Sequence, residues 1–392
     1  MTQQPIPQSI AAANSPFAAF TFEKRIPFIF DQIRSNNKLT PAQTDELVRL
    51  LAEIQTGVVA PMPDDFLPID RPYWEKFIKK HGNRTYADVP FFEAEAYIYY
   101  RIMRIVDYPN SGVDPFGKLK KDGVEENLAV LDGLARRHQN EGDHFNEDYF
   151  TVLLYNALWA NSADLSQIDA HDVLRDERLR GRLVIDHIPA LIHQINKADV
   201  TALDYVVDNA GIELMADFFL ADYLLRTGRV QRINLHVKQY PIFVSDATEA
   251  DVAEHLAIML QAGSESLAHF SRAVQDWQEA GKLRVISHPF WNSPLHFTEM
   301  PADLTGGFDE GSLLLFKGDA NYRRLFEDRA WPPSTPIADV LHYFKQPCAS
   351  IRTLKSEIVL GISDQQAARL TKEDPDWLTN GRYGLVMFQP AP

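Results

Sequence analysis

The strongest constraint on the fold is an apolar segment that ends at an acid and leads directly into a helix. Residues 202–207 are mostly apolar, which is typical of a buried strand in a parallel sheet. Apolar residues between positions 212 and 226 recur at helical spacing, so a helix begins there. Asp208 and Asn209 therefore follow the carboxyl end of a strand, the edge at which open α/β sheets bind ligands. Their oxygens suit a divalent cation, and the alternative is that Asp208 only caps the helix.

The second half of the chain alternates between strand-like and helix-like segments. Strands are expected at 202–207, 232–237, 282–287, 311–316, 349–352 and 383–388, and helices at 212–226, 248–262, 267–280, 321–328 and 338–344. This alternation predicts an α/β fold at residues 199–392, with a mostly parallel, Rossmann-like sheet covered by helices on both faces as a three-layer α/β/α domain. Residues 241–244 are ambiguous between strand and loop.

The first half has helical patterns instead. Residues 1–20 are rich in Pro, Gln, Ala and Ser and are expected to form a flexible arm. Helices are expected at about 40–57, 70–82, 91–106, 124–137 and 145–158, with another ending near 197. We expect no strand before about residue 201, and therefore a helical N-terminal domain at residues 21–198.

Composition narrows the class of protein. The net charge of −15 argues against a nucleic-acid surface, because binding phosphate backbones needs a basic face. The single cysteine, Cys348, excludes an intramolecular disulfide and fits a reducing compartment. The N-terminus lacks the pattern of a signal peptide, and no apolar run reaches membrane-spanning length. We expect a cytoplasmic protein without nucleic-acid or membrane partners, and the oligomeric state stays open.

Other strand ends in the second half also carry polar groups. Asp246 stops the apolar run 242–244, and it could join Asp208 and Asn209 in an all-oxygen cation site or cap the next helix. Acidic and amide side chains at several strand ends favour one shared site. A further candidate is Glu213, in the first turn of the helix that follows Asp208.

Two strand ends near positions 317 and 352 supply positive charge. Gly318 allows close backbone approach, and amides at a helix start after it would face an anion. Lys355 could bind a phosphoryl oxygen as a point charge. The alternative for each of these cations is an exposed ion pair with Glu or Asp. The candidate anion-binding residues are Asp319, Ala320, Asn321, Tyr322, Arg323 and Lys355, with Arg352 as a further possibility.

The first half adds three weaker candidates, Glu95, Arg101 and Asn161. Glu95 and Arg101 belong to a strongly aromatic helix, where the alternative is core packing with a surface ion pair. Asn161 follows the helix that ends near Leu158 and could serve only as its C-terminal cap.

Taken together, these motifs resemble the damage-control phosphatase family, in particular the subfamily marked by an RTxK motif. The matching segments are Arg352-Thr353-Leu354-Lys355 for RTxK, residues 317–323 for KGDxNYR, residues 208–213 for DNxGxE, residues 94–102 for the AExYxYRRI helix, residues 159–166 for WGNxxDLS, and Asp246 for the metal aspartate. The resemblance spans roughly residues 20 to 390 in the expected order. Ala160 and Tyr100 depart from the family pattern, which has glycine and often arginine there; these departures bear on substrate fit more than on chemistry.

The resemblance implies a metal-dependent phosphatase that hydrolyses sugar phosphate monoesters such as fructose 1-phosphate or fructose 6-phosphate, in metabolite damage control. The implied ion is Mn²⁺, Co²⁺, Ni²⁺ or Mg²⁺, held by Asp208, Asn209 and Asp246. Residues 319–323 and Lys355 would contact the substrate. Attack by water and an aspartyl-phosphate intermediate are both open.

Two alternatives remain beside hydrolysis. Animal relatives have been named for carboxyl methylation with S-adenosylmethionine, although residues 206–214 have one glycine where such a site usually has a glycine-rich loop. The other alternative is a non-catalytic sugar-phosphate sensor, which predicts binding without turnover.

Overall fold

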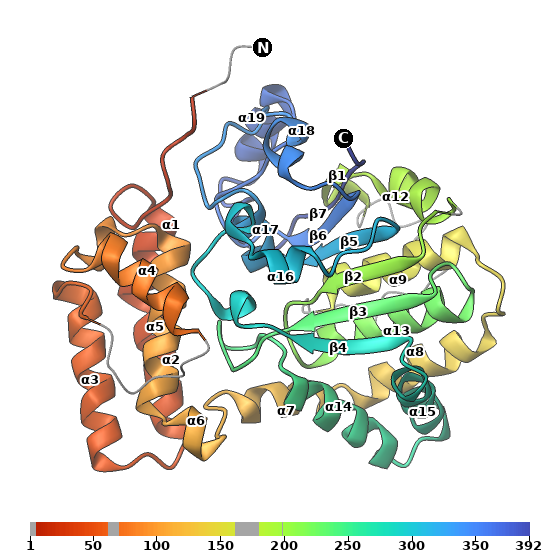
Figure 1. The fold of residues 1–392 in the computed structure, drawn as a ribbon, viewed down its shortest axis with the longest axis horizontal. Coiled ribbons are helices and arrows are strands. Elements are labelled where there is room, and N and C mark those ends of the chain that lie inside the picture. The colour runs from red at the N-terminus through yellow and green to blue at the C-terminus, as the bar shows by residue number, and fades with distance from the viewer. Residues whose placement is uncertain (1–4, 62–69, 161–179, 198) are drawn as a thin grey trace.

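The computed structural model describes residues 5–61, 70–160, 180–197 and 199–392. Figure 1 shows a group of N-terminal helices standing beside a larger body built on a twisted sheet. None of the helices in these ranges combines the length and apolar character needed to cross a membrane. The helices of the first half are α1 (Pro16–Phe20), the π-helical turn η1 (Thr21–Arg25), α2 (Ile26–Asn36), α3 (Pro41–Thr56), α4 (Arg71–His81), the short turn η2 (Tyr86–Asp88), α5 (Phe91–Ile105), α6 (Tyr108–Ser111), α7 (Gly117–Glu125), α8 (Leu128–Asn140) and α9 (Glu147–Trp159).

Helix α5 is the centre of the N-terminal group. Almost all of its residues are buried, including the charged Glu93, Glu95 and Arg101. A helix that is surrounded on all sides is held by packing rather than by one apolar stripe. Phe91 at its start packs edge-on against Phe22 of η1, with ring centroids 5.4 Å apart. This contact fixes the first helices of the chain beside the start of α5.

The expected mostly parallel sheet is confirmed. It has seven strands in the order β1-β7-β6-β5-β2-β3-β4. Neighbours from β6 to β4 are parallel, whereas β7 is antiparallel to β6 and parallel to β1. The strands are β1 (Leu183–Asp186), β2 (Ala202–Val206), β3 (Arg232–Val237), β4 (Leu283–Ser287), β5 (Ser312–Lys317), β6 (Cys348–Thr353) and β7 (Gly384–Gln389).

Two apolar cores lie on opposite faces of this sheet, because side chains alternate along each strand. Leu203 and Tyr205 of β2 belong to one core, and Val206 belongs to the other. On the first face α9 packs on α13 and on β6, and on the second face α17 contacts β5 and β6. The remaining helices are α12 (Ile188–Ile195), α13 (Ile212–Arg226), α14 (Glu249–Gln261), α15 (Glu265–Glu279), η4 (Pro289–Asn292), η5 (Phe297–Glu299), α16 (Ala302–Thr305), α17 (Gly318–Leu325), α18 (Ile337–Val340), η6 (Leu341–Tyr343) and α19 (Asp364–Glu373).

The strand order determines where a ligand site can form. From β2 the chain proceeds to β3 and β4 on one side, and later returns to β5 on the other side. The neighbouring strands β2 and β5 therefore flank a topological switch point, where a crevice opens at their carboxyl ends. Asp208 follows β2, and Gly318 follows β5. The two segments that the sequence singled out thus border the same crevice.

The expectation of no strand before about residue 201 is wrong. β1 (Leu183–Asp186) pairs with β7 at the edge of the sheet. A four-residue edge strand is too short for a clear alternating pattern, and its partner lies about 200 residues further along the chain. The division into domains at residue 198 stays a prediction.

Two other segments have a defined backbone structure. Ser9 and Ala11 form bridges with Arg329 and Pro90, and α1 follows, so this part of residues 1–20 is held against the protein. The ambiguous segment 241–244 is a loop, in which Phe243 and Val244 adopt left-handed backbone angles with φ of 50° and 73°. A β-branched residue is rarely found in that region, so this loop is held there by its surroundings.

Candidate active site

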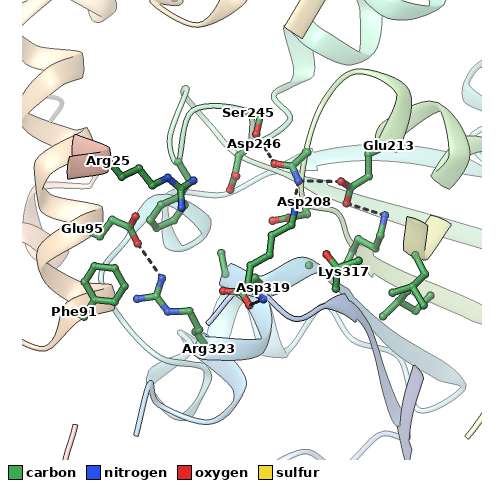
Figure 2. Close-up of a pocket in the computed structure, with 18 of the residues that line it drawn as sticks. Arg25, Phe91, Glu95, Asp208, Glu213, Ser245, Asp246, Lys317, Asp319 and Arg323 are labelled. Carbon is green, nitrogen blue, oxygen red and sulfur yellow. Dashed lines mark hydrogen bonds and ion pairs between the residues drawn. The ribbon is translucent and has the colours of Figure 1, made fainter. Parts of the chain in front are cut away.

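A polar cavity of about 160 Å³ opens at the switch point between β2 and β5. Figure 2 shows acidic and basic side chains converging on it from both halves of the chain. The α/β body contributes the turn after β2, the loop before α14, the start of α17 and the end of β6. The predicted site residues that line the cavity are Asp208, Asn209, Glu213, Asp246, Asp319, Ala320, Arg323, Lys355 and Glu95.

Backbone pairing places Asp208 and Asn209, which follow β2, beside Asp246 of a separate loop. Asn209 and Asp246 form an antiparallel bridge. The amide of Ala247 donates to the carbonyl of Asp208 over 2.8 Å, and the amide of Ala210 donates to the carbonyl of Ser245 over 2.7 Å. Main-chain hydrogen bonds therefore fix the segment that carries Asp208 relative to the segment that carries Asp246.

Burial makes the charged form of both carboxylates unfavourable. Burial, and then the negative charges of Asp246 and Glu213, raise the pKa of Asp208 well above its usual value. Burial also raises the pKa of Asp246, although Lys238 opposes this shift. Lys238 Nζ lies 3.2 Å from Asp246 Oδ2 but is not aligned for a hydrogen bond. Two buried carboxylates facing one another favour binding of a cation.

A buried ion-pair network links the end of β5 to the first turns of α13, next to the turn after β2. Lys317 Nζ lies 3.0 Å from Glu213 and 2.9 Å from Asp217. Burial alone would lower the pKa of Lys317, but these two acids outweigh it and raise the pKa. Glu213 in turn accepts a hydrogen bond of 2.9 Å from Asn209 Nδ2, and Ser245 Oγ donates to Asn209 Oδ1 over 2.6 Å. Glu213 therefore orients the side chain of Asn209.

The start of α17 faces the acidic pair. Gly318, Asp319 and Ala320 line the cavity, and the first N–H groups of a helix have no partner within it. Gly318 has φ of +85°, and a Cβ atom there would overlap the side chain of Asp208. Glycine therefore permits this close approach between β2 and β5. A helix N-terminus opposite a cation site suits an anion that bridges the two.

Asp319 connects α17 to the end of β6. Its Oδ1 atom accepts hydrogen bonds from Arg352 Nε at 2.8 Å, from the Lys355 amide at 3.2 Å and from Ser356 Oγ at 3.1 Å. The carboxylate is thus engaged in positioning the segment that carries Lys355. The Lys355 side chain is exposed and lines the cavity, and no salt bridge of its ammonium group occurs within the described ranges.

Arg323 reaches the N-terminal helices. Its guanidinium binds Glu95 at 2.9 Å and Asp328 at 3.0 Å, and its central carbon lies 4.4 Å from the ring centroid of Phe91. Burial would lower the pKa of Arg323, but Asp328 and Glu95 raise it. Arg323 therefore joins α17 to α5 and keeps Glu95 at the wall of the cavity.

Other candidates lie outside the cavity lining. Asn321 donates to the carbonyls of Val207 and Lys317, and the Tyr322 hydroxyl accepts from the amide of Leu360. Buried Arg352 holds Asp319 and the loop after β6. Arg101 pairs with Glu53 of α3 instead. Asn161 lies outside the described residues.

Several lining residues were not among the sequence candidates. They are Phe17, Arg25, Phe91, Leu158, Phe243, Ser245, Ile351 and Thr353. Ser245 directly precedes Asp246, so its place in the sequence could have suggested it. Lys317 and Gly318, which the sequence indicated as a local cation and as a point of close backbone approach, line the cavity too. Phe17 and Arg25 belong to the first helices, which reach the cavity only through tertiary packing. No local pattern in the sequence indicates that these helices line the cavity.

The chemistry of the donor set fits a hard divalent cation. Asp208 and Asp246 supply carboxylate oxygens and Asn209 supplies an amide oxygen, the ligand types that Mg²⁺ and Mn²⁺ take. Over the described ranges, no three His, Cys, Asp or Glu side chains are grouped to hold a metal ion by themselves. An ion here would therefore need water or substrate oxygens to complete its coordination.

Fold and cavity together define an α/β protein with a polar cavity, lined by acids and cations, at the switch point of its sheet. Comparison with known proteins specifies the family. Residues 21–370 match the model of the damage-control phosphatase ARMT1-like domain. The chain therefore belongs to the damage-control phosphatase ARMT1-like family, whose members are hydrolases.

Individual relatives agree with this assignment. The chain is 31% identical over 381 residues to damage-control phosphatase ARMT1 of Mus musculus, covering 87% of this chain and 85% of the relative. It is 27% identical over 439 residues to the Homo sapiens protein of that name, covering 98% of each. A crystal structure of a DUF89 family protein from Pyrococcus horikoshii has a TM-score of 0.50 at 14% identity, covering 97% of this chain and 99% of that one, which supports the fold alone.

Proposed function

We propose that this protein is a metal-dependent phosphatase that hydrolyses sugar phosphate monoesters of the fructose 1-phosphate or fructose 6-phosphate type. The observation that carries the proposal is the arrangement of two buried carboxylates opposite the free N-terminus of α17, with Lys355 beside them. The complete motif from Arg352 to Lys355 supports placement in the RTxK subfamily.

The metal would be held by Asp208, Asn209 and Asp246. When bound, a divalent ion supplies Lewis acidity and neutralises charge on the phosphoryl oxygens. Mn²⁺, Co²⁺, Ni²⁺ and Mg²⁺ are all compatible with oxygen donors. Lys317 and Glu213 hold the Asn209 amide in place, and the main-chain bridge keeps Asp246 beside it.

The chain's own groups then bind and orient the ester. Backbone N–H groups at the start of α17 donate to equatorial phosphoryl oxygens, and Lys355 adds a point charge that stabilises the transition state. Aromatic side chains of Phe17, Phe91 and Phe243 wall the cavity and limit access of bulk water.

Two routes to the products remain open. In the first, a water oxygen bonds to phosphorus, the ester P–O bond breaks, and a water proton passes to the leaving sugar oxygen. In the second, an aspartate oxygen bonds to phosphorus as the ester P–O bond breaks and the leaving sugar oxygen takes up a proton from solvent. Water then cleaves the aspartyl phosphate and releases inorganic phosphate and the free aspartate. Trapping of a phosphorylated aspartate by mass spectrometry distinguishes the routes.

The test is phosphate release from fructose 1-phosphate by protein stripped with EDTA and then supplied with Mn²⁺. We expect turnover only with the metal, and loss of turnover in Asp246→Asn with the fold retained by circular dichroism. Turnover at the same rate in EDTA contradicts the metal dependence. Binding of S-adenosylmethionine in calorimetry, without phosphate release, would favour the methyltransferase alternative.

A further inference from the structure

The cavity wall formed by the N-terminal helices contains a cation that the α/β body does not supply. Arg25 lines the cavity from the last residue of the π-helical turn η1. Figure 2 shows Arg25 and Glu95 on the side of the cavity opposite Glu213 and Lys317. The cavity is therefore lined by two parts of the chain, one on each side of it.

Arg25 differs from the buried cations around the cavity. Lys317 is paired with Glu213 and Asp217, and Arg323 is paired with Glu95 and Asp328. Arg25 is exposed and makes neither a hydrogen bond nor an ion pair with any residue in the described part of the chain. Its guanidinium thus retains all five donors for a ligand.

The backbone that carries Arg25 is nonetheless fixed. Phe22 and Ile26, on either side of it, are buried, and the Ile26 amide donates to the carbonyl of Thr21, which widens the turn by one residue. Phe22 and Phe17 both pack edge-on against Phe91 of α5. Single π-helical turns of this kind are frequent at functional sites, because the extra residue redirects a side chain.

Beside Arg25 lies an acceptor. Glu95 lines the same wall, and Arg323 engages its Oε2 atom. Both groups act on the buried hydroxyl of Tyr99: after burial, Glu95 raises the pKa of that phenol, whereas Arg25 lowers it. A guanidinium carried on a fixed backbone, on the same cavity wall as a carboxylate, presents donors and acceptors together, and neighbouring hydroxyl groups of a sugar need both.

From this arrangement we infer that Arg25 is a specificity-determining residue, which with Glu95 binds the hydroxyl groups of the sugar at the end away from the phosphate. This inference rests on the proposed phosphatase function and assigns the residues that recognise the sugar part of the ester. The phosphate itself is held at the opposite side, by the start of α17 and by Lys355. Arg25 therefore contributes to binding of the sugar and not to binding of the phosphoryl group.

The test compares fructose 1-phosphate with p-nitrophenyl phosphate, which has no sugar hydroxyls, in the Mn²⁺-loaded full chain. Arg25→Ala should raise KM for fructose 1-phosphate by about 10- to 100-fold, the loss of a charge-assisted hydrogen bond. KM for p-nitrophenyl phosphate and the inhibition constant of inorganic phosphate should stay within about twofold. Arg25→Lys, which keeps the charge but loses the planar fork, should fall between wild type and Arg25→Ala.

The matched control is Lys24→Ala, one residue earlier in the same turn, exposed and outside the cavity lining. It makes the same change in net charge and should leave both KM values unchanged. Equal losses for both esters in Arg25→Ala would make Arg25 a phosphate ligand and overturn the inference, as would wild-type selectivity in that variant. Inactivity of the wild type toward both esters contradicts the proposed function and this inference with it.

Discussion

The side chain of Asp208 lies against the α-carbon of Gly318, where a Cβ atom would overlap the carboxylate. The contact joins the ends of β2 and β5 across the switch point of the sheet. Gly318 also has φ of +85°, a backbone conformation that disfavours any side chain. Two independent constraints therefore require glycine at the position where α17 begins.

Gly318→Ala should consequently reduce kcat by about 100-fold or more, because a displacement of a catalytic group by about 1 Å has costs of this size. The measurement is phosphate release with saturating Mn²⁺, with circular dichroism to confirm the fold. Gly133→Ala is the matched control. Gly133 lies within α8 with open space around it, so the same change should raise the free energy of unfolding by about 0.5–1 kcal/mol and leave kcat unchanged. Near-normal kcat in Gly318→Ala would remove the Asp208 carboxylate from the reacting site.

Val244 offers a test of the strain in the loop that carries Asp246. At an ordinary position glycine is less stable than alanine by about 0.5–1 kcal/mol. Val244 has φ of +73°, where an L-residue with a Cβ atom is penalised by about 1–2 kcal/mol. Val244→Gly should therefore be more stable than Val244→Ala by about 1 kcal/mol in urea unfolding, since both variants lose the same packing. The opposite order would show that the loop is relaxed in solution.

Asp70 should make stability depend on pH. Burial raises the pKa of Asp70 to about 6, although hydrogen bonds from Tyr240 and Trp74 act to lower it. The folded protein thus holds a proton that the unfolded chain releases near pH 4. The contribution of Asp70 to stability is present below pH 4 and is lost as pH rises through about 6.

The shift from 3.8 to about 6 corresponds to a loss on the order of 3 kcal/mol. The wild type should lose this stability between pH 4 and pH 7, whereas Asp70→Asn cannot titrate at this position. The free energy of unfolding of Asp70→Asn minus that of wild type should therefore be larger at pH 7 than at pH 4 by about that amount. Urea unfolding at both values measures the difference, and Asp31→Asn, on an exposed side chain, controls for net charge. A difference that is independent of pH would contradict the raised pKa.

The strand ends of the second half could be predicted because their signals are local. An apolar run that stops at Asp208, followed by helical spacing, defines both the strand and the edge of the sheet at which the acid lies. The edge strand β1 could not be predicted, because its four residues form a strand only by pairing with β7.

The contribution of the N-terminal helices was predicted only in part. Glu95 and Arg101 both appeared as candidates on one aromatic helix, but six residues at 3.6 per turn place them about 120° apart around the helix axis. Glu95 faces the cavity, and Arg101 faces Glu53 on the other side of α5. Arg25 had no local signal at all, because only the packing of Phe22 on Phe91 brings it to the site.

The arginine of the RTxK motif has a different task from its lysine, and this can be tested. Arg352 is fully buried and donates to Asp319, to both the carbonyl and the hydroxyl of Ser356, and to the carbonyl of Ile358, over 2.6–3.1 Å. Its guanidinium also lies 4.2 Å from the ring centroid of Tyr322. These contacts fix the segment on which Lys355 is carried.

A lysine at position 352 cannot make this planar set of contacts, so Arg352→Lys should lower the free energy of unfolding by about 3 kcal/mol, as expected when a buried charge loses its partners. Lys355→Met, on an exposed side chain, should instead leave stability within about 0.5 kcal/mol of wild type and reduce phosphate release. Urea unfolding and turnover, measured on both variants, separate the two roles. Equal stability of Arg352→Lys and wild type would mean that the loop after β6 is held by its other contacts and would contradict the structural role of Arg352.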